Sequence, residues 1–384
     1  MREERLILQV LSEQQEEVQG YNSSRWVERY EERLFEWESD LAQVVIGVRR
    51  SGKSTLCHKV LLERGIRYGY VNLDDDRLFG ITTEDLNTVL SAVYQLYGAD
   101  ISYLFLDEIQ NVEGWHLFVN RLLRQGMHVV VSGSNAKLLS SELATHLVGR
   151  YNEIRLYPLS FRELCMLKGV DMESITTKAE AERKRLLNTY LTDGGMPELY
   201  KLSNPHTRRV YVESLLETVV MRDIVQRYRI QQAESLRRIA NHLINNVCQC
   251  IDYGQLKELA NLGSLTTVQK YVSYLSQAFL IYRLAPFSFK SRERMTREKV
   301  YVIDTGFIAN RENSLLPANM GWRLENMVLV ELLRRNHSAA EDIYYYRPSS
   351  RHKEVDFVVC RQGKVLELLQ VAYDISDKKT RKRE

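Results

Sequence analysis

The stretch Gly47-Val48-Arg49-Arg50-Ser51-Gly52-Lys53-Ser54-Thr55 decides the fold of this chain. It matches the phosphate-binding loop pattern G-x-x-x-x-G-K-[ST] at every fixed position. The apolar run before it, Val44–Ile46, suits a buried strand, and residues 56–64 have a helical composition. Glycines permit the sharp turn between the two, which points backbone N–H groups at an anion. The stretch therefore predicts a nucleotide site at residues 47–55, with Lys53 on the β- and γ-phosphates.

Two acids follow a second apolar run, Tyr103–Leu106. In an open α/β sheet, ligands bind at the carboxyl ends of the strands. We expect Asp107 to hold Mg²⁺ through water, beside the hydroxyl of Ser54. We expect Glu108 to orient and deprotonate an attacking water. Together with the loop, the acids favour ATP hydrolysis over nucleotide binding alone.

A third polar strand end, Ser132-Gly133-Ser134-Asn135, follows the apolar residues Val130 and Val131. Asn135, or in its place Ser132 or Ser134, is expected to hydrogen-bond the attacking water or the γ-phosphate. A cap for the next helix is the alternative interpretation of Asn135.

Three arginines are further candidates. Arg150 could neutralise charge on the γ-phosphate, from the same chain or from a neighbouring subunit, and an ordinary surface arginine is the alternative interpretation. Arg49 and Arg50 either touch phosphates or pair with acids such as Asp74–Asp76.

Strand-like runs alternate with helical stretches between residues 41 and 158. This rhythm predicts βαβ units, and hence an α/β fold with a mostly parallel sheet. The segment 1–40 is expected to be helical. The predicted strands are Val44–Ile46, Tyr68–Leu73, Tyr103–Leu106, Val129–Ser132 and Glu153–Leu156.

The rest of the chain suggests further domains. Residues 159–240 have a helical pattern. Residues 241–290 read as a winged helix-turn-helix. A helix at Gln255–Leu262 is followed by a break at Gly263-Ser264. A second helix, from Val268 to Phe279, is expected to be capped by Thr266 or Thr267, and a strand follows it. Residues 291–384 read as a small α/β domain that begins with the strand Lys299–Asp304.

These motifs, in order, resemble the prokaryotic predicted AAA+ ATPases that carry a C-terminal domain akin to restriction endonucleases. The resemblance spans nearly the whole chain. It implies an AAA+ P-loop core at 41–158, a helical lid, a winged helix, and a PD-(D/E)xK-like domain at the end. Further matching motifs are Tyr157-Pro158-Leu159-Ser160-Phe161, Gly194-Gly195-Met196-Pro197, Tyr301-Val302-Ile303-Asp304-Thr305-Gly306, Gly321-Trp322-Arg323-Leu324-Glu325-Asn326 and Glu354-Val355-Asp356-Phe357.

The terminal domain departs from an active nuclease, which needs an acid on one strand and acid-x-Lys on the next. Glu325, Asp356 and Glu331 are available acids, but Gln370 stands where the second acid belongs, and Ala372 where the lysine belongs. An alternative register uses Glu367 as the acid and then puts Leu369 in place of the lysine. We predict a degenerate fold without nuclease activity.

The amino-acid composition does not indicate which molecules this protein binds. A net charge of +3 over 384 residues favours no strongly acidic or basic partner. Five cysteines form no disulfide or metal pattern, and no signal peptide or membrane span is evident, so a cytoplasmic protein is expected. DNA could contact the winged helix and a basic cluster at residues 290–299. The members of this cluster are Lys290, Arg292, Arg294, Arg297 and Lys299.

The sequence thus predicts an ATPase that uses ATP and Mg²⁺ to drive a conformational change, with a homo-oligomer as one possible state. A slow nucleotide-dependent switch that binds DNA or a protein is the first alternative. An ATP-dependent nuclease is the second.

Overall fold

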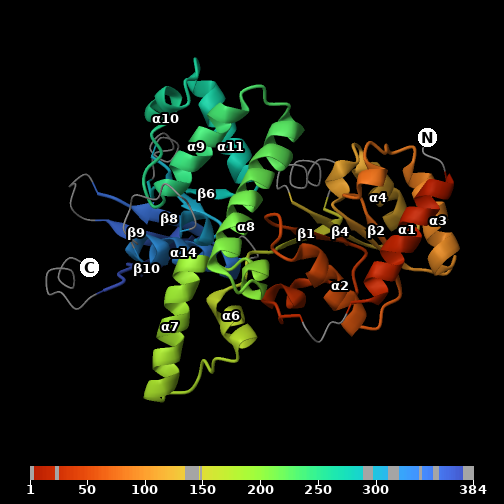
Figure 1. Ribbon diagram of the computed structural model, residues 1–384, viewed down its shortest axis with the longest axis horizontal. Helices are drawn as coiled ribbons and strands as arrows, with labels where there is room; N and C mark the ends of the chain where they lie inside the picture. The colour runs from red at the N-terminus through yellow and green to blue at the C-terminus, as the bar shows by residue number, and fades with distance from the viewer. Residues whose placement is uncertain are drawn as a thin grey trace. The chain divides into compact units, whose positions relative to one another are not determined.

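Figure 1 shows the computed structural model of the chain. The structure describes residues 4–21, 26–134, 147, 149–288, 297–309, 320–336, 340–348 and 354–374. The chain divides into two compact units. The first comprises Met1–Gly47 and Ser51–Leu156, and the second comprises Val48–Arg50 and Tyr157–Glu384.

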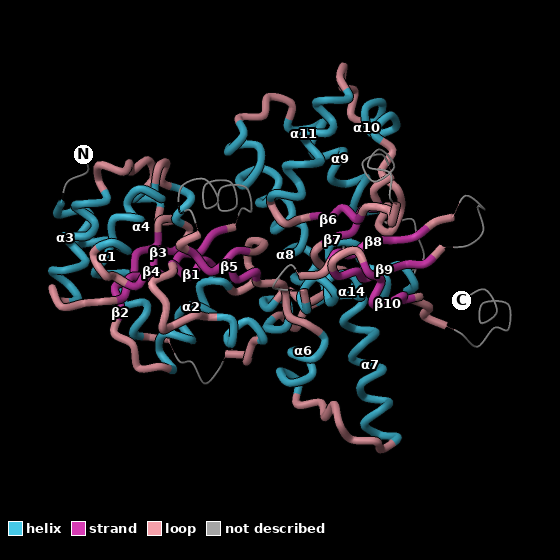
Figure 2. The backbone as a smooth tube through the Cα atoms, turned by 180° about the vertical axis from the view of Figure 1, so that it is seen from behind, coloured by secondary structure: helices cyan, strands magenta, loops and turns pink. Residues whose placement is uncertain are grey.

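The first unit is built on a parallel sheet of five strands in the order β2-β3-β4-β1-β5. This confirms the predicted parallel α/β architecture. Helix α2 packs on β1 and β4, and α4 packs against β4 from the opposite face (Figures 1 and 2). The elements are α1 (Glu4–Gln19), η2 (Tyr30–Leu34), β1 (Ala42–Ile46), α2 (Lys53–Glu63), β2 (Tyr68–Asn72), η3 (Asp76–Leu78), α3 (Leu86–Tyr97), β3 (Tyr103–Asp107), η4 (Ile109–Asn111), α4 (Trp115–Arg124), β4 (His128–Gly133) and β5 (Tyr151–Arg155).

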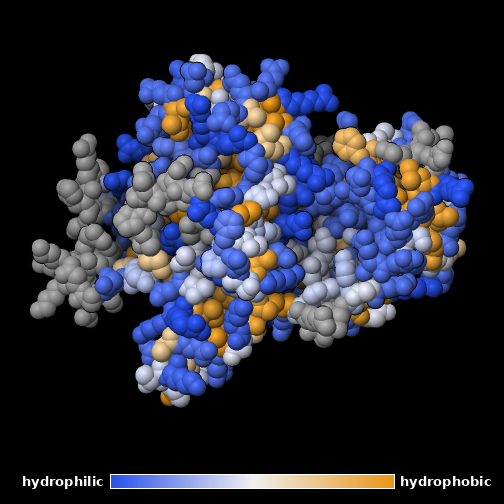
Figure 3. All heavy atoms as spheres, in the orientation of Figure 1, coloured by the Kyte–Doolittle hydropathy of each residue, from blue (hydrophilic) through white to orange (hydrophobic). Residues whose placement is uncertain are grey.

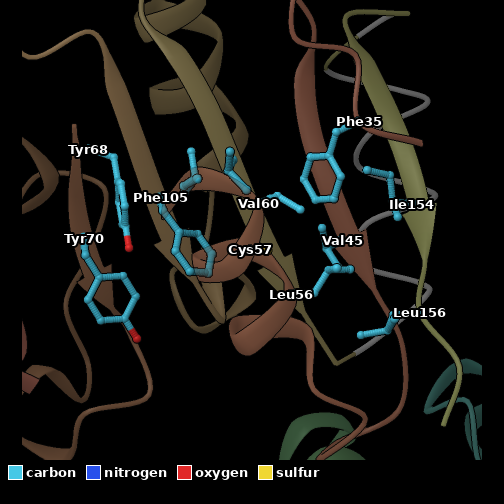
Figure 4. Close-up of a cluster of buried hydrophobic side chains, with 12 residues drawn as sticks. Phe35, Val45, Leu56, Cys57, Val60, Tyr68, Tyr70, Phe105, Ile154 and Leu156 are labelled. Carbon is cyan, nitrogen blue, oxygen red and sulfur yellow. The ribbon is translucent and has the colours of Figure 1, made fainter. Parts of the chain in front are cut away.

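Apolar side chains of the sheet and of α2 form the core of this unit (Figure 4). Val45 on β1 and Phe105 on β3 are fully buried, and Leu56 and Val60 approach them from α2. Burial of apolar area at about 25 cal/mol per Å² stabilises this packing. The core fixes α2 against the strands, and therefore fixes the loop that joins β1 to α2.

Helix α1 covers the edge of the sheet at β2. The Gln14 side chain accepts a hydrogen bond from the Asn72 backbone N–H at 2.9 Å and donates one to the Asn72 carbonyl oxygen at 3.1 Å. A side-chain amide thus satisfies the backbone at the end of an edge strand, which otherwise offers unpaired groups. Of the segment 1–40 that was predicted to be helical, Glu4–Gln19 forms an α-helix and Tyr30–Leu34 a 3₁₀ helix.

The second unit contains helices, a two-stranded antiparallel sheet of β6 and β7, and a three-stranded sheet in the order β10-β9-β8. Its surface is mostly hydrophilic on the face seen in Figure 3, with apolar side chains gathered around α6 and α7. The elements are α6 (Phe161–Lys168), α7 (Thr177–Asp193), η6 (Pro197–Lys201), α8 (Pro205–Thr218), η7 (Val219–Gln226), α9 (Ala233–Asn245), α10 (Tyr253–Leu259), α11 (Leu265–Gln277), β6 (Ile281–Leu284), β7 (Lys299–Val302), α13 (Gly306–Ala309), α14 (Met320–Arg335), β8 (Asp342–Tyr346), β9 (Val355–Arg361) and β10 (Lys364–Leu369).

One sequence prediction for this unit is wrong in detail. Ser264, and not Thr266 or Thr267, caps α11, because its side chain accepts the Thr266 backbone N–H at 3.2 Å. The strand that begins at Lys299 pairs antiparallel with β6, the strand that follows α11. No local pattern in the sequence indicates this pairing.

A buried carboxylate joins two of the glycine-containing motifs. Asp304 accepts hydrogen bonds from the backbone N–H groups of Gly195 at 2.6 Å and Gly306 at 2.8 Å. A Cβ on Gly195 would lie 2.2 Å from the Leu159 carbonyl oxygen, so no other residue fits there without displacing the backbone. These motifs therefore form a structural junction inside the second unit.

Candidate nucleotide site

The loop between β1 and α2 has the backbone of a phosphate-binding loop. Gly52 is the N-cap of α2 with φ 98°, in the left-handed region, and no side chain caps this helix. Its first-turn N–H groups therefore face an anion site without a competing side-chain acceptor. A Cβ at Gly47 would lie 2.1 Å from the Leu156 carbonyl oxygen, so only glycine lets the loop pass the end of β5. Arg50, at φ 66°, adopts a strained conformation that is typical of functional loops.

Lys53 and Glu108 are brought together at the carboxyl end of the sheet. The Lys53 Nζ lies 3.6 Å from the Glu108 Oε1, and both side chains are largely buried. The other carboxylate oxygen of Glu108, Oε2, accepts a hydrogen bond from the Gln110 Nε2. The groups predicted to bind phosphate and to activate water are thus paired with each other.

Asp107 is enclosed by hydrogen-bond donors. Its Oδ1 accepts from the Ser132 hydroxyl, its Oδ2 accepts from the Tyr70 hydroxyl at 3.3 Å, and the Ser54 side chain bonds it too. Burial raises the pKa of Asp107, and the Glu108 charge adds to this, while the Ser132 and Ser54 hydrogen bonds and Lys53 oppose it. A carboxylate and a hydroxyl in contact are the hard oxygen ligands that Mg²⁺ prefers, so these residues fit the ion.

Of the two loop arginines, Arg49 contacts an acid in the second unit. Arg49 forms a bidentate ion pair with Asp223 on the π-helix η7, with Nη2 to Oδ1 at 3.0 Å and Nε to Oδ2 at 3.1 Å. One of the two interpretations paired this arginine with acids such as Asp74–Asp76, and the acid that Arg49 contacts is Asp223. Asp223 is 174 residues away in the sequence, and no local pattern indicates it.

Arg150 lies away from the loop within one chain. It precedes β5, and its carbonyl oxygen accepts the Ala42 backbone N–H at 3.0 Å at the amino end of β1. Parallel strands rise about 3.3 Å per residue, so the length of β1 separates Arg150 from Gly47. The role in the same chain therefore does not fit the position of this exposed arginine.

Asn135 lies outside the described residues, and so do Lys290, Arg292 and Arg294 of the predicted basic cluster. Lys299, the last member of that cluster, is buried and is not a surface cation.

The sequence predictions missed several residues around the nucleotide site. Ser132 and Ser134 were considered only as contacts of water or phosphate, although Ser132 bonds Asp107. Arg29 donates to the Ser51 carbonyl oxygen at 3.3 Å from the segment before β1. The signal that could have shown Ser132 is a lone hydroxyl inside the apolar strand His128–Gly133.

Two of the predicted nuclease acids, Glu325 and Asp356, lie in a charged cluster of the second unit, while Glu331 pairs with Arg334 and Arg335. Lys299 Nζ pairs with Glu325 Oε1 at 3.3 Å and with Glu354, and its side chain is 4% exposed. Tyr301 donates to Glu325 at 2.8 Å. Burial raises the pKa of Asp356 to about 6. Among the described residues, no group of three or more His, Cys, Asp or Glu side chains is arranged to hold a metal ion.

Comparison with known proteins assigns the first unit to a class. Residues 39–165 match the family described as "AAA domain". The matched residues include the loop, Asp107 and Glu108. The protein thus contains an AAA-type ATPase domain with a parallel α/β sheet. Residues 184–315 and 320–383 match two families, each described as a domain of unknown function.

The whole chain belongs to one family with two curated relatives. The uncharacterized protein MJ1544 of Methanocaldococcus jannaschii is 32% identical over 341 residues, which cover 87% of this chain and 75% of the relative. An uncharacterized protein of Haemophilus influenzae is 30% identical, with 91% of this chain and 87% of the relative covered. The Walker-type ATPase PABY2304 of Pyrococcus abyssi is a similar solved structure, with a TM-score of 0.49, 14% identity, and coverage of 74% of this chain and 95% of that chain.

Within the described part of the chain, no helix combines the length and apolar character that crossing a membrane requires.

Proposed function

We propose that this protein is an Mg²⁺-dependent ATPase whose active site is the loop 47–55 with Asp107 and Glu108. The observation that carries this proposal is the contact between Lys53 and Glu108, because it joins the phosphate-binding lysine to a carboxylate at the edge of the sheet where the loop lies. A phosphate loop without such a carboxylate would suggest nucleotide binding alone.

The chemistry divides among the residues in a simple way. The N–H groups of the loop bind the phosphates, and Lys53 exchanges its contact with Glu108 for the β- and γ-phosphates. Ser54 and Asp107 would hold Mg²⁺, which when bound neutralises charge on the phosphates. Glu108 accepts a proton from water as the water oxygen bonds to the γ-phosphorus. The bond from that phosphorus to the bridging oxygen breaks, which yields ADP and phosphate, and the proton passes from Glu108 to solvent.

Phosphate release from ATP tests the proposal. Wild-type protein should release phosphate, Glu108→Gln should bind nucleotide without releasing it, and Lys53→Ala should lose binding. We expect Glu108→Gln to lower kcat on the order of 10²-fold or more, since general-base groups contribute this much. A wild-type protein that releases no phosphate above the Glu108→Gln background would refute the proposal.

A second candidate function, DNA binding, is favoured by one observation. The antiparallel pair β6–β7 follows α10 and α11 directly, and this order of elements is that of a winged helix with its wing between the strands. We propose that Lys270 on α11 and the cations of residues 290–297 contact the DNA backbone. Lys299 is excluded because it is buried.

Duplex binding measured at several salt concentrations tests the DNA proposal. Replacing Lys270 and Arg292 should weaken binding and reduce its salt dependence, since each phosphate contact adds to the slope. Binding that these changes leave unaltered would contradict the proposal.

For residues 320–374, we propose a nuclease-like fold without nuclease activity. Gln370 and Ala372 follow the end of β10, and the Asp356 Oδ2 already accepts the Val371 backbone N–H at 2.7 Å. Plasmid incubated with Mg²⁺ or Mn²⁺ should stay intact. Cleavage that disappears in Asp356→Ala would show that the domain is active.

A further inference from the structure

Gln110 holds one of the two carboxylate oxygens of Glu108. The Oε2 accepts from the Gln110 amide, while the Oε1 faces Lys53 at 3.6 Å. Because a carboxylate can only accept, the Gln110 atom that meets it must be the nitrogen. The Oε1 of Gln110 then remains as an acceptor, and it is buried without a hydrogen-bond partner among the described residues.

Gln110 belongs to a short, well-anchored turn. The 3₁₀ helix η4 (Ile109–Asn111) follows Glu108 directly, and Ile109 is fully buried. Glu108 itself has φ 52°, a left-handed conformation that is uncommon for a residue with a side chain. The Ser132 hydroxyl accepts the Glu108 backbone N–H at 3.2 Å. The backbone of Glu108 is therefore fixed, and the direction of its carboxylate depends on Gln110.

Gln110 also reaches the next strand. Its Nε2 lies 3.5 Å from the Ser134 Oγ, just beyond the end of β4, and the Gln110 side chain is buried. The amide thus connects the turn after β3 to the residues after β4.

We infer that Gln110 is a positioning residue for the ATPase reaction, and this inference rests on the proposed function. When a nucleotide draws Lys53 to its phosphates, the Oε1 of Glu108 loses its counter-ion and becomes available to water. Gln110 keeps the Oε2 in place, so that the carboxylate presents the Oε1 in one orientation. Lys53 on α2 and Asp107 on β3 are charged neighbours of this carboxylate.

The substitution Gln110→Met tests this role, because methionine has a similar length and no donor. Misplacing a reacting group by about 1 Å can cost 10²-fold in rate, so we expect kcat to fall by about 10-fold or more. KM for ATP and the affinity for a fluorescent ATP analogue should stay within about twofold, because the hydrogen bonds of the Gln110 side chain go to Glu108 and Ser134. The matched control is Asn111→Ala in the same turn, whose amide donates to the Leu73 carbonyl oxygen and to Asp74; its kcat should equal that of wild type.

The outcomes are distinguishable. Wild-type protein that binds nucleotide without hydrolysing it refutes the proposed function, and the inference with it, before any Gln110 variant is made. If wild type hydrolyses ATP and Gln110→Met matches its kcat, the inference alone is refuted. Equal losses of kcat and nucleotide affinity also refute it, since they would indicate general damage to the site. If the methionine variant does not fold, Gln110→Asn serves instead: a lowered kcat at unchanged KM supports the inference, and a wild-type kcat refutes it.

Discussion

Ser132 connects both acids of the candidate site through one hydroxyl. Its Oγ donates to the Asp107 Oδ1 and accepts the Glu108 backbone N–H. We predict that Ser132→Ala raises the Mg²⁺ concentration for half-maximal hydrolysis by about 10-fold, because groups that orient a metal ligand typically contribute 10–100-fold in affinity. Loss of the hydrogen bond also removes an interaction that opposes the raised pKa of Asp107. A Mg²⁺ titration of phosphate release measures the shift.

Tyr70→Phe is the matched comparison for Ser132→Ala. It removes only the hydrogen bond to the Asp107 Oδ2, whose length of 3.3 Å makes it a weak one, and it keeps the aromatic ring in the core. Its effect on the Mg²⁺ requirement should be smaller. A Ser132→Ala protein with the wild-type Mg²⁺ requirement would contradict the prediction.

Residues that are defined by a local motif were predictable, and residues that act across strands were not. Lys53, Ser54 and Asp107 lie together as expected, because the loop pattern and the strand end determine their places. Gln110 and Ser132 were missed in these roles because each acts through a contact that depends on how the chain folds around β3 and β4. Sequence spacing does not specify such contacts.

Among the elements of the second unit, the junction around Asp304 should make stability depend on pH. Burial raises the pKa of Asp304 to about 6, in spite of the hydrogen bonds from Gly195 and Gly306. The folded state therefore binds this proton more tightly than the unfolded chain, where the pKa is near 3.8. Its contribution to the free energy of unfolding falls as pH rises from about 4 to about 6, by about 3 kcal/mol, and is constant above that.

Asp304→Asn isolates this contribution, because asparagine does not titrate. The free energy of unfolding, measured in urea at several pH values, should fall less steeply with pH in the variant than in wild type. If the free energy of unfolding changes with pH in the same way in both proteins, then folding does not raise the pKa of Asp304. Asp356, whose pKa is also raised to about 6, titrates in both proteins and cancels in the comparison.

Lys299 should be important for the stability of β7 and α14. Burial lowers its pKa, but Glu325 and Glu354 outweigh this effect and raise the pKa above its ordinary value. Lys299→Met leaves Glu325 without this counter-ion, while Glu354 keeps the Arg347 Nε at 3.7 Å. Breaking a buried ion pair in this way costs about 3–5 kcal/mol. Urea unfolding at neutral pH measures the loss, and Glu325→Gln in the same chain should restore part of it. If the free energy of unfolding falls by less than about 1 kcal/mol, the Lys299–Glu325 ion pair contributes no more than an exposed salt bridge does, and the prediction is wrong.

Most helices and strands could be predicted from the sequence, because apolar periodicity and turn residues mark them. The parallel strands lie within a few residues of their predicted positions, because each is an apolar run bounded by polar turns. The pairing of β6 with β7 was not predicted, since their connection is long and their partners are set by packing. The Arg49–Asp223 pair was missed for the same reason.

At the scale of the whole molecule, the position of Arg150 leads us to predict that copies of this chain assemble with one another. Within one chain it lies at the amino end of β5, while the loop lies at the carboxyl end of β1, so its charge would reach a γ-phosphate only in a neighbouring copy. Arg150→Ala and Glu108→Gln should then each be nearly inactive alone. Mixed together, they should regain activity, because an Arg150→Ala site keeps its own Glu108 and receives Arg150 from a Glu108→Gln neighbour. The specific activity of wild type should also rise with protein concentration. A mixture no more active than its components, at concentrations where the copies associate, would exclude the role in a neighbouring subunit and leave Arg150 as an ordinary surface cation.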